Sequence, residues 1–385
     1  MTRLERLQAA GVSIWLDTLS RELLDSGRLE RHVREHVVTG VTANPTILER
    51  ALADSSAYDA QLGRLADLRT SPKAAFFELA LDDVRAAAEL LRPAHDDSGG
   101  RDGFVSFEVT PDLAHEPGGT IDQALALWRR LGLPNVMIKV PGTAAGLPAI
   151  EKLTSLGVNV NVTLLFSLTR YEQVIDAYLR GLERRLDTGR PLDGITSVAS
   201  FFVSRIDAKV DPLLPVDSPL RGRIAVANAR RAYARQRALF EGDRWARLRA
   251  AGAREQRPLW ASTGTKDPAL ADVHYVESLI APETIDTMPE GTLLAFADHG
   301  EVRDPIDLAS ESPRQVLAEA AHAGIDLERL TAELERQGLE SFSGSYERLL
   351  ERLGPALSPG AARPVRPSSR TSRARRPQVA STTSR

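Results

Sequence analysis

Residues 158–166 read VNVNVTLLF, and an earlier segment, residues 136–142, reads VMIKVPG. In the first, Asn159, Asn161 and Thr163 alternate with valines, and this period of two puts the two kinds of side chain on opposite faces of a β-strand. In a barrel strand, the valines pack against outer helices while the polar side chains point inward. Enclosed polar groups need partners, which a ligand, ordered water or one another can supply. The two segments therefore predict barrel strands around a polar interior.

Short strand-like segments alternate with longer amphipathic ones along most of the chain. Residues 120–131 and 169–185 have apolar side chains at i, i+3, i+4 and i+7, which predicts helices. Strands that alternate with helices pair in parallel, and eight such units predict a closed (β/α)8 TIM barrel of the α/β class. The predicted strands are residues 13–18, 40–46, 104–109, 136–141, 158–166, 197–203, 259–263 and 285–288.

Extra helices and a C-terminal tail complete the predicted organisation. A helical insertion covers residues 225–257, and helices within residues 312–353 pack outside the barrel or over one end. We predict one catalytic domain over residues 1–353. A disordered Arg/Pro/Ser-rich tail over residues 356–385 is expected, because it has too few apolar residues to offset the entropy of ordering. A doubly wound open sheet is the competing fold, and it is disfavoured because no glycine-rich phosphate fingerprint follows the first strand.

The composition is that of a globular protein that acts away from membranes. Hydrophobic residues make up 42% of the chain, yet no stretch approaches the roughly 18–20 apolar residues of a membrane span. The N-terminus lacks the apolar core of a secretory signal. Cysteine is absent, which excludes disulfides and thiolate chemistry. We expect a cytoplasmic protein, and the sequence leaves a homodimer open.

The charge is distributed unevenly. Seven of the 49 basic residues and none of the 52 acidic ones lie in residues 356–385, so the rest of the chain carries a net charge of about −10. An acidic body argues against nucleic acid as the main ligand, because nucleic-acid binding depends on clustered positive charge.

Lys139 is the strongest candidate for a catalytic residue. It interrupts an apolar strand, and burial is expected to lower the pKa of a lysine and to supply the neutral amine that attacks a carbonyl. An edge-strand or ion-paired lysine is the alternative interpretation. The other strands favour catalysis, because they too carry polar residues near their C-terminal ends, where barrel enzymes build their sites. These include Asp17, Asn44, Glu108 and Asn161.

Asp17 and Glu108 suit the proton transfers of imine chemistry. Forming and hydrolysing a Schiff base requires protonation of a departing hydroxyl and activation of a water, and carbon–carbon cleavage requires a base. Ion pairing with Lys139 is the structural alternative for both carboxylates. No cofactor is called for, because the protonated imine is itself the electron sink. No metal is expected either, because the seven histidines show no HxH or HExxH spacing.

Six segments, in order, resemble the motif set of the transaldolases. They lie within residues 15–207, and two further segments extend the resemblance to about Leu294. The six read WLDTLSR, GVTANPT, SFEV, VMIKVPGT, NVNVTLLFS and SFFVSRID, and the two read LWASTGTKDP and DTMPEGTL. The segment ASTGTK is similar to the branch of the family that is also found fused to a glucose-6-phosphate isomerase.

The resemblance implies catalytic roles for four residues. Lys139 forms the imine with the ketose donor. Asp17 is the base for carbon–carbon cleavage and the acid in the reverse addition. Glu108 and Thr163 hold the water that shuttles protons while the imine forms and hydrolyses.

The resemblance also implies substrate contacts. Asn44 and Asn161 hydrogen-bond the hydroxyls of the dihydroxyacetone unit. Ser200 and Arg205 lie at the far end of the donor, where the forked guanidinium of Arg205 pairs with phosphate. On its own, an arginine at position 205 would be interpreted as a surface ion pair.

One segment departs from the family pattern. Many transaldolases carry Ser-x-Arg after the seventh strand, and that arginine also binds phosphate. Here Ser262 is followed by Thr263 and then by Gly264 at the position of the arginine, and Lys266 supplies a positive charge two residues further on.

The activity implied is that of a transaldolase of the pentose phosphate pathway. It moves a dihydroxyacetone unit from sedoheptulose 7-phosphate to glyceraldehyde 3-phosphate, giving erythrose 4-phosphate and fructose 6-phosphate, through a Schiff base on Lys139. The alternative is a fructose-6-phosphate aldolase-like class I aldolase that releases free dihydroxyacetone, although such relatives often lack the motif that contains Asp17. A non-enzymatic scaffold that binds a partner through its arginine-rich tail is a third hypothesis, and the retention of Lys139 argues against it.

Overall fold

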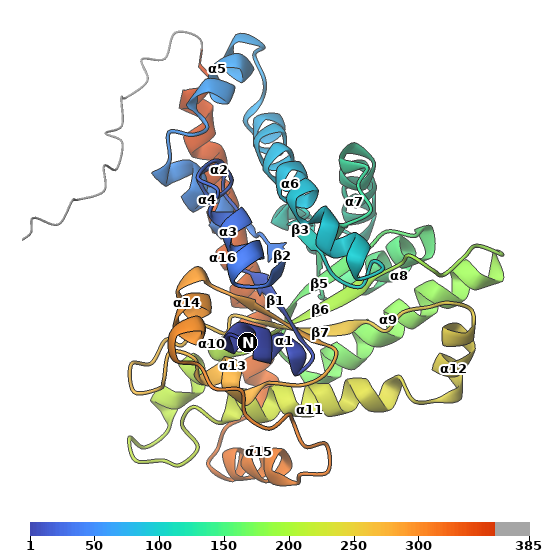
Figure 1. Ribbon diagram of the computed structural model, residues 1–385, viewed down its shortest axis with the longest axis vertical. Helices are drawn as coiled ribbons and strands as arrows, with labels where there is room; N and C mark the ends of the chain where they lie inside the picture. Colours follow the sequence, from blue (N-terminus) through green and yellow to red (C-terminus); the bar gives the residue numbers. More distant parts are fainter. Residues whose placement is uncertain (359–385) are drawn as a thin grey trace, which may run out of the picture.

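The computed structural model describes residues 1–358. Eight parallel strands close into a barrel in the order β1 to β8, and the helices surround them (Figure 1). The TIM-barrel prediction is confirmed. The strands are β1 (Val12–Leu16), β2 (Val38–Thr42), β3 (Phe104–Glu108), β4 (Val136–Pro141), β5 (Val160–Leu165), β6 (Ser197–Phe202), β7 (Arg257–Ala261) and β8 (Thr284–Met288).

The helices connect and cover these strands. In the first half of the chain they are α1 (Arg3–Ala9), α2 (Arg21–Asp25), α3 (Arg28–Glu35), α4 (Pro45–Asp54), α5 (Asp59–Asp67), α6 (Pro72–Asp97), the 3-10 turn η1 (Pro111–Leu113), α7 (Pro117–Leu131), α8 (Gly146–Leu156) and α9 (Leu168–Asp187). In the second half they are α10 (Ser204–Val210), the 3-10 turn η2 (Asp211–Leu213), α11 (Ile224–Leu239), α12 (Asp243–Ala250), α13 (His274–Ser278), α14 (Glu290–His299), α15 (Ser312–His322) and α16 (Leu327–Ala356). Within the described residues, no helix is long and apolar enough to span a membrane.

Several predicted strand limits were wrong by a few residues. The largest error concerns residues 40–46, because β2 ends at Thr42 and α4 begins at Pro45. Asn44 caps this helix by accepting a hydrogen bond from the Ile47 amide (3.0 Å), and proline is well suited to the first helical turn. The insertion predicted over residues 225–257 is two helices, α11 and α12, and its last residue already belongs to β7.

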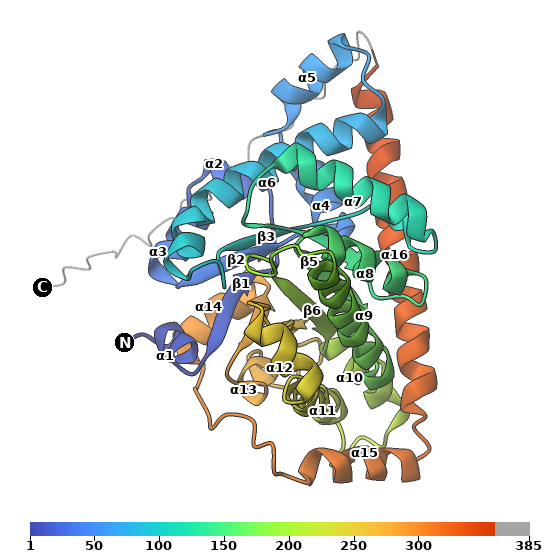
Figure 2. The same ribbon diagram turned by 90° about the vertical axis from the view of Figure 1, so that its right-hand side faces the viewer.

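The C-terminal helices α15 and α16 are present as predicted. Helix α16 runs along one side of the barrel, from beside α5 to α15 (Figure 2). Its buried side chains include Leu334, Phe342 and Leu349. Gly338 of α16 packs closely against the side chain of Leu164. A Cβ at Gly338 would lie only 2.9 Å from that side chain. The disordered tail was predicted over residues 356–385, but Ala356 still belongs to α16; the residues from 359 onward lie outside the described part of the chain.

Trp15 of β1 packs against Gly40 of β2 and Phe104 at the start of β3. It is fully buried, and its indole nitrogen donates a 2.7 Å hydrogen bond to Asp102. The neighbouring strand position must be glycine, because a Cβ at Gly40 would lie 2.4 Å from the indole ring. Core contacts this short force backbone or side-chain shifts.

We therefore expect Gly40→Ala to destabilise the fold by about 1–3 kcal/mol, as overpacked cores do. The change is measured by urea unfolding followed by circular dichroism. Gly118→Ala is the matched control, because no atom lies within 4 Å of a Cβ at this helical glycine. Equal unfolding midpoints for the two variants would contradict the predicted clash.

Candidate active site

A cavity of about 640 Å³ opens at the carboxyl-terminal mouth of the barrel. Its wall includes strand ends, the loops that follow them and residues of α4, α10, α14 and α16. Seven of the ten predicted site residues line it: Asp17, Asn44, Lys139, Ser200, Arg205, Ser262 and Lys266. The other three, Glu108, Asn161 and Thr163, are buried and do not line it.

Lys139 reaches this cavity from the middle of the barrel wall. It lies in β4, its side chain is 5% exposed, and its ammonium group donates a 3.3 Å hydrogen bond to the carbonyl of Ala43. Glu108 of the adjacent strand β3 forms an ion pair with it at 3.6 Å. The sequence left ion pairing with Lys139 open as an alternative role for Glu108. That ion pair is present, and it places an acid beside the amine.

Glu108 is a buried carboxyl that titrates near neutrality. Desolvation raises its pKa to about 7, against the opposing effect of the positive charge on Lys139. Its Oε2 atom has no hydrogen-bond partner among the described residues. A carboxyl with this pKa can both give and take a proton at neutral pH.

Asp17 lies at the end of β1 and faces the cavity. Burial raises the pKa of its carboxyl above the usual value, while the charge on Lys139 and a hydrogen bond from Thr42 act in the opposite direction. Thr42 Oγ1 donates to this carboxylate at 2.7 Å and lies 2.7 Å from the hydroxyl of Thr287. Because Thr42 donates its only hydrogen to Asp17, Thr287 is the donor in the second bond.

The fifth strand supplies a polar layer beneath the cavity. The Asn161 amide nitrogen donates to Ser106 Oγ at 2.9 Å, and its carbonyl oxygen accepts from Ser200 Oγ at 2.7 Å. Asn161 therefore orients Ser200, which lines the cavity. Thr163 is also buried, and its hydroxyl has no partner among the described residues. Asn159, just before β5, donates to the carbonyls of Pro134 and Val136.

Arg205 and Lys266 form a cationic wall of the cavity, and they are close enough for the charge of one to act on the other. The Arg205 guanidinium stacks over the Phe202 ring at 5.1 Å, and burial lowers its pKa. Burial also lowers the pKa of Lys266, and the positive charge on Arg205 lowers it further. Arg50 of α4 lines the same cavity. None of the three cations is ion-paired to a carboxylate within the part of the chain that the structure describes, so this wall suits an anionic group.

The sequence was compared with known protein families. Residues 14–353 match the family model of transaldolase/fructose-6-phosphate aldolase. The chain belongs to this family. Similar curated proteins include the transaldolase of Saccharopolyspora erythraea, 48% identical over 91% of this chain and 96% of that protein. Transaldolase 1 of Streptomyces coelicolor is 48% identical, with 90% and 93% covered. The transaldolase of Mycobacterium bovis is 47% identical, with 90% and 95% covered. The family and the enzyme class predicted from the sequence are confirmed.

Gly264 stands where many members of the transaldolase family carry a phosphate-binding arginine, and its surroundings are crowded. A Cβ at this position would lie 3.3 Å from both Pro289 and Thr292 at the start of α14. Lys266 lines the cavity nearby. Ser262, two residues earlier, adopts the left-handed conformation with φ of 58°, and its hydroxyl lies 3.1 Å from that of Ser204. The loop thus turns sharply before it presents the lysine.

Sequence reasoning missed several cavity residues of this transaldolase-family chain. Thr42 had a local signal, because it lies two residues before Asn44 and so shares its face of the strand predicted over residues 40–46. Arg50 had a weaker one, since it follows Ile47 by one helical turn and both line the cavity. Phe342 and its neighbour Ser341 had none, because they arrive on α16 from the far end of the chain.

Proposed function

We propose that this chain is a transaldolase that moves a dihydroxyacetone unit from sedoheptulose 7-phosphate to glyceraldehyde 3-phosphate in the pentose phosphate pathway. The observation that carries the proposal is the buried Lys139 amine at a cavity with a cationic wall, ion-paired to Glu108 and close enough to Asp17 for their charges to interact. Family membership adds independent support.

The proposed reaction begins at the lysine. The neutral amine of Lys139 attacks the ketone carbon of the donor, and the protonated carboxyl of Glu108 assists departure of the hydroxyl as water. Asp17 then takes the proton of the hydroxyl next to the scissile bond. The carbon–carbon bond breaks, the aldehyde leaves, and the electron pair is held as an enamine on Lys139 until the acceptor arrives. Addition to the acceptor and hydrolysis of the imine reverse these steps.

A product assay separates transfer from simple cleavage. The chain is supplied with sedoheptulose 7-phosphate and glyceraldehyde 3-phosphate, and fructose 6-phosphate, erythrose 4-phosphate and free dihydroxyacetone are quantified. We expect the two sugar phosphates in equal amounts and no net dihydroxyacetone. Release of dihydroxyacetone at the rate of turnover would instead assign the chain to the aldolase-like alternative.

The pKa of Glu108 predicts a pH effect on imine formation. Because its carboxyl is ionised as the pH rises through about 7, the acid that expels the hydroxyl is lost above that pH. We expect the rate of borohydride trapping, measured in a single turnover, to decline above about pH 7. Glu108→Gln should lower this rate about 10²–10⁴-fold and remove the inflection. An unchanged inflection in the variant would assign it to another group.

The cationic wall predicts a selective loss of phosphate binding. Arg205→Ala and Lys266→Met are each expected to raise KM for fructose 6-phosphate about 10- to 100-fold. This factor corresponds to the free energy of one hydrogen bond to a charged group. Turnover of unphosphorylated fructose should not change, because that substrate has no group to pair with either cation. If Lys266→Met left KM for the phosphorylated donor unaltered, Lys266 would not replace the missing arginine.

A further inference from the structure

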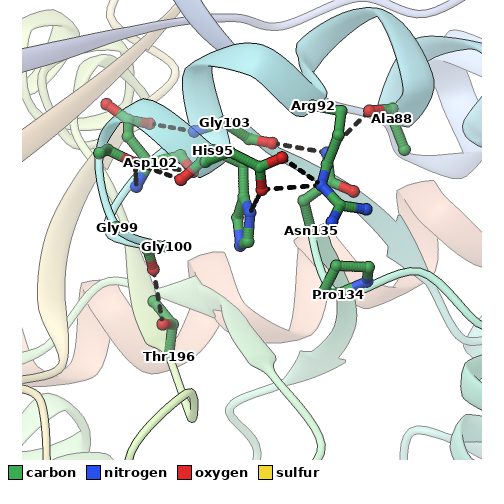
Figure 3. Close-up of polar contacts among 12 residues, drawn as sticks. Ala88, Arg92, His95, Gly99, Gly100, Asp102, Gly103, Pro134, Asn135 and Thr196 are labelled. Atoms are coloured by element: carbon green, nitrogen blue, oxygen red, sulfur yellow. Dashed lines mark hydrogen bonds and ion pairs between the residues drawn. The ribbon is translucent and has the colours of Figure 1, made fainter.

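A second cavity, of about 490 Å³, lies at the opposite end of the barrel. Its wall includes residues at the amino-terminal ends of the strands, such as Thr196 before β6, Arg257 at the start of β7 and Glu283 before β8. Because all eight strands are parallel, this end lies away from the mouth that holds Lys139. Figure 3 shows part of the wall, where the loop of Gly99 and Gly100 lies against Thr196.

The wall of this cavity has a surplus of positive charge. Five arginines and two glutamates line it: Arg101, Arg237, Arg249, Arg254, Arg257, Glu255 and Glu283. Each glutamate is already paired, Glu255 with Arg237 at 2.7 Å and Glu283 with Arg101. The other three arginines have no carboxylate partner within the described part of the chain, which leaves the wall about three charges positive.

Two of these three arginines are held in place by neutral oxygens. Arg254 donates to the carbonyl of Gly99 at 2.8 Å, to the carbonyl of Gly100 and to the Thr196 hydroxyl. Arg257 donates to the carbonyls of Arg101, Glu283 and Thr284 at 3.1, 3.3 and 2.9 Å and to the Ser13 hydroxyl at 2.7 Å, which leaves one of its five N–H groups free. Burial lowers the pKa of Arg257. These bonds fix the guanidinium groups and join the loops at this end of the barrel, but they do not neutralise the charge.

Loop anchoring does not account for Arg249. It is exposed on α12, and its side chain makes no hydrogen bond or ion pair with residues 1–358. Trp245, one helical turn earlier, lines the same cavity and is 2% exposed. Its indole N–H has no acceptor among the described residues, although a buried indole normally finds one. The cavity is therefore lined by an arginine side chain without a partner, Arg249, and by a buried N–H donor without an acceptor, that of Trp245.

We propose that this cavity binds a small molecule that carries a diphosphate or polyphosphate group, at a site separate from the barrel mouth. The volume is within the range of small-molecule sites. Guanidinium groups form charge-assisted hydrogen bonds with phosphate oxygens, and three arginines without a carboxylate partner match a group with two or more negative charges. The preset orientation of Arg254 and Arg257 reduces the ordering that binding requires.

The test is calorimetric titration of the full-length chain with inorganic pyrophosphate. Arg205→Ala and Lys266→Met are combined in every protein compared, which removes two of the three cations at the barrel mouth. In this background, Arg249→Glu is expected to weaken pyrophosphate binding about tenfold or more. Arg247→Glu is the matched control, because it reverses a charge on the same helix outside the cavity lining and should leave binding unchanged.

Fluorescence supplies a local readout. Pyrophosphate is expected to change the tryptophan emission of the background protein, and Trp245→Phe should abolish that change, since Trp245 lines the cavity and the other three tryptophans do not. Equal affinity in the Arg249→Glu and Arg247→Glu proteins would overturn the proposal. So would a background protein that does not bind pyrophosphate at millimolar concentrations. Neither result would bear on transfer activity.

Discussion

Lys139→Met is expected to abolish transfer, with turnover about 10⁴-fold or more below that of the original protein, as when a nucleophile is removed from other enzymes. Methionine fills the space of the lysine stem but cannot condense with a ketone. The chain has only five lysines, so a covalent adduct is readily mapped. The original protein is incubated with fructose 6-phosphate and borohydride, digested and analysed by peptide mass.

The expected adduct is a reduced three-carbon unit on Lys139 alone. Lys152→Met, a substitution on α8 away from the cavity lining, should retain both the adduct and full activity. Trapping on any other lysine, or turnover by the Lys139→Met protein, would refute the Schiff-base mechanism.

The Lys139→Met protein should remain folded, and its stability should depend on pH in a defined direction. Removing the lysine leaves Glu108 without its ion pair, so the pKa of that carboxyl rises beyond about 7. A carboxyl whose pKa is higher in the folded than in the unfolded state makes stability fall as the pH rises through that interval. We expect the Tm of the variant to fall by more between pH 5 and pH 8 than the Tm of the original protein does.

The sequence predicted the barrel because its strands carry their signal locally. The alternation in residues 158–166 and the polar residues at strand ends are readable without knowledge of tertiary contacts. Strand limits were less accurate where one residue has two roles. Asn44 lies two residues after the end of β2, lines the cavity and also caps α4, so its polar character indicates the site but not the strand boundary.

The parts of the site that sequence could not predict depend on contacts across the barrel. The role of Asn161 as a substrate contact stays a prediction, but the hydrogen bonds of its amide with Ser106 and Ser200 were not foreseen. That pairing follows from which side chains of β3, β5 and β6 meet inside the barrel. Phe342 reaches the cavity only because α16 packs along the barrel wall. Neither fact is encoded in a local pattern.

Asp17→Asn is expected to separate imine formation from carbon–carbon cleavage. Asparagine keeps the size of the side chain and can still accept the hydrogen bond from Thr42, so the cavity should be preserved. It cannot act as a base, and kcat for transfer should fall about 10²–10⁴-fold. The Lys139 amine and Glu108 remain, so fructose 6-phosphate should still condense with the lysine.

The trapped species then distinguishes the roles of the two acids. Borohydride should capture a three-carbon adduct on the original protein, but an intact six-carbon sugar phosphate on the Asp17→Asn protein, because the bond is not cleaved after the imine has formed. Asp112→Asn removes a carboxylate from η1, which follows β3, and this residue lies outside the cavity lining. That control should give the three-carbon adduct. A three-carbon adduct on the Asp17→Asn protein would assign the base to another group, and absence of any adduct would place Asp17 in imine formation itself.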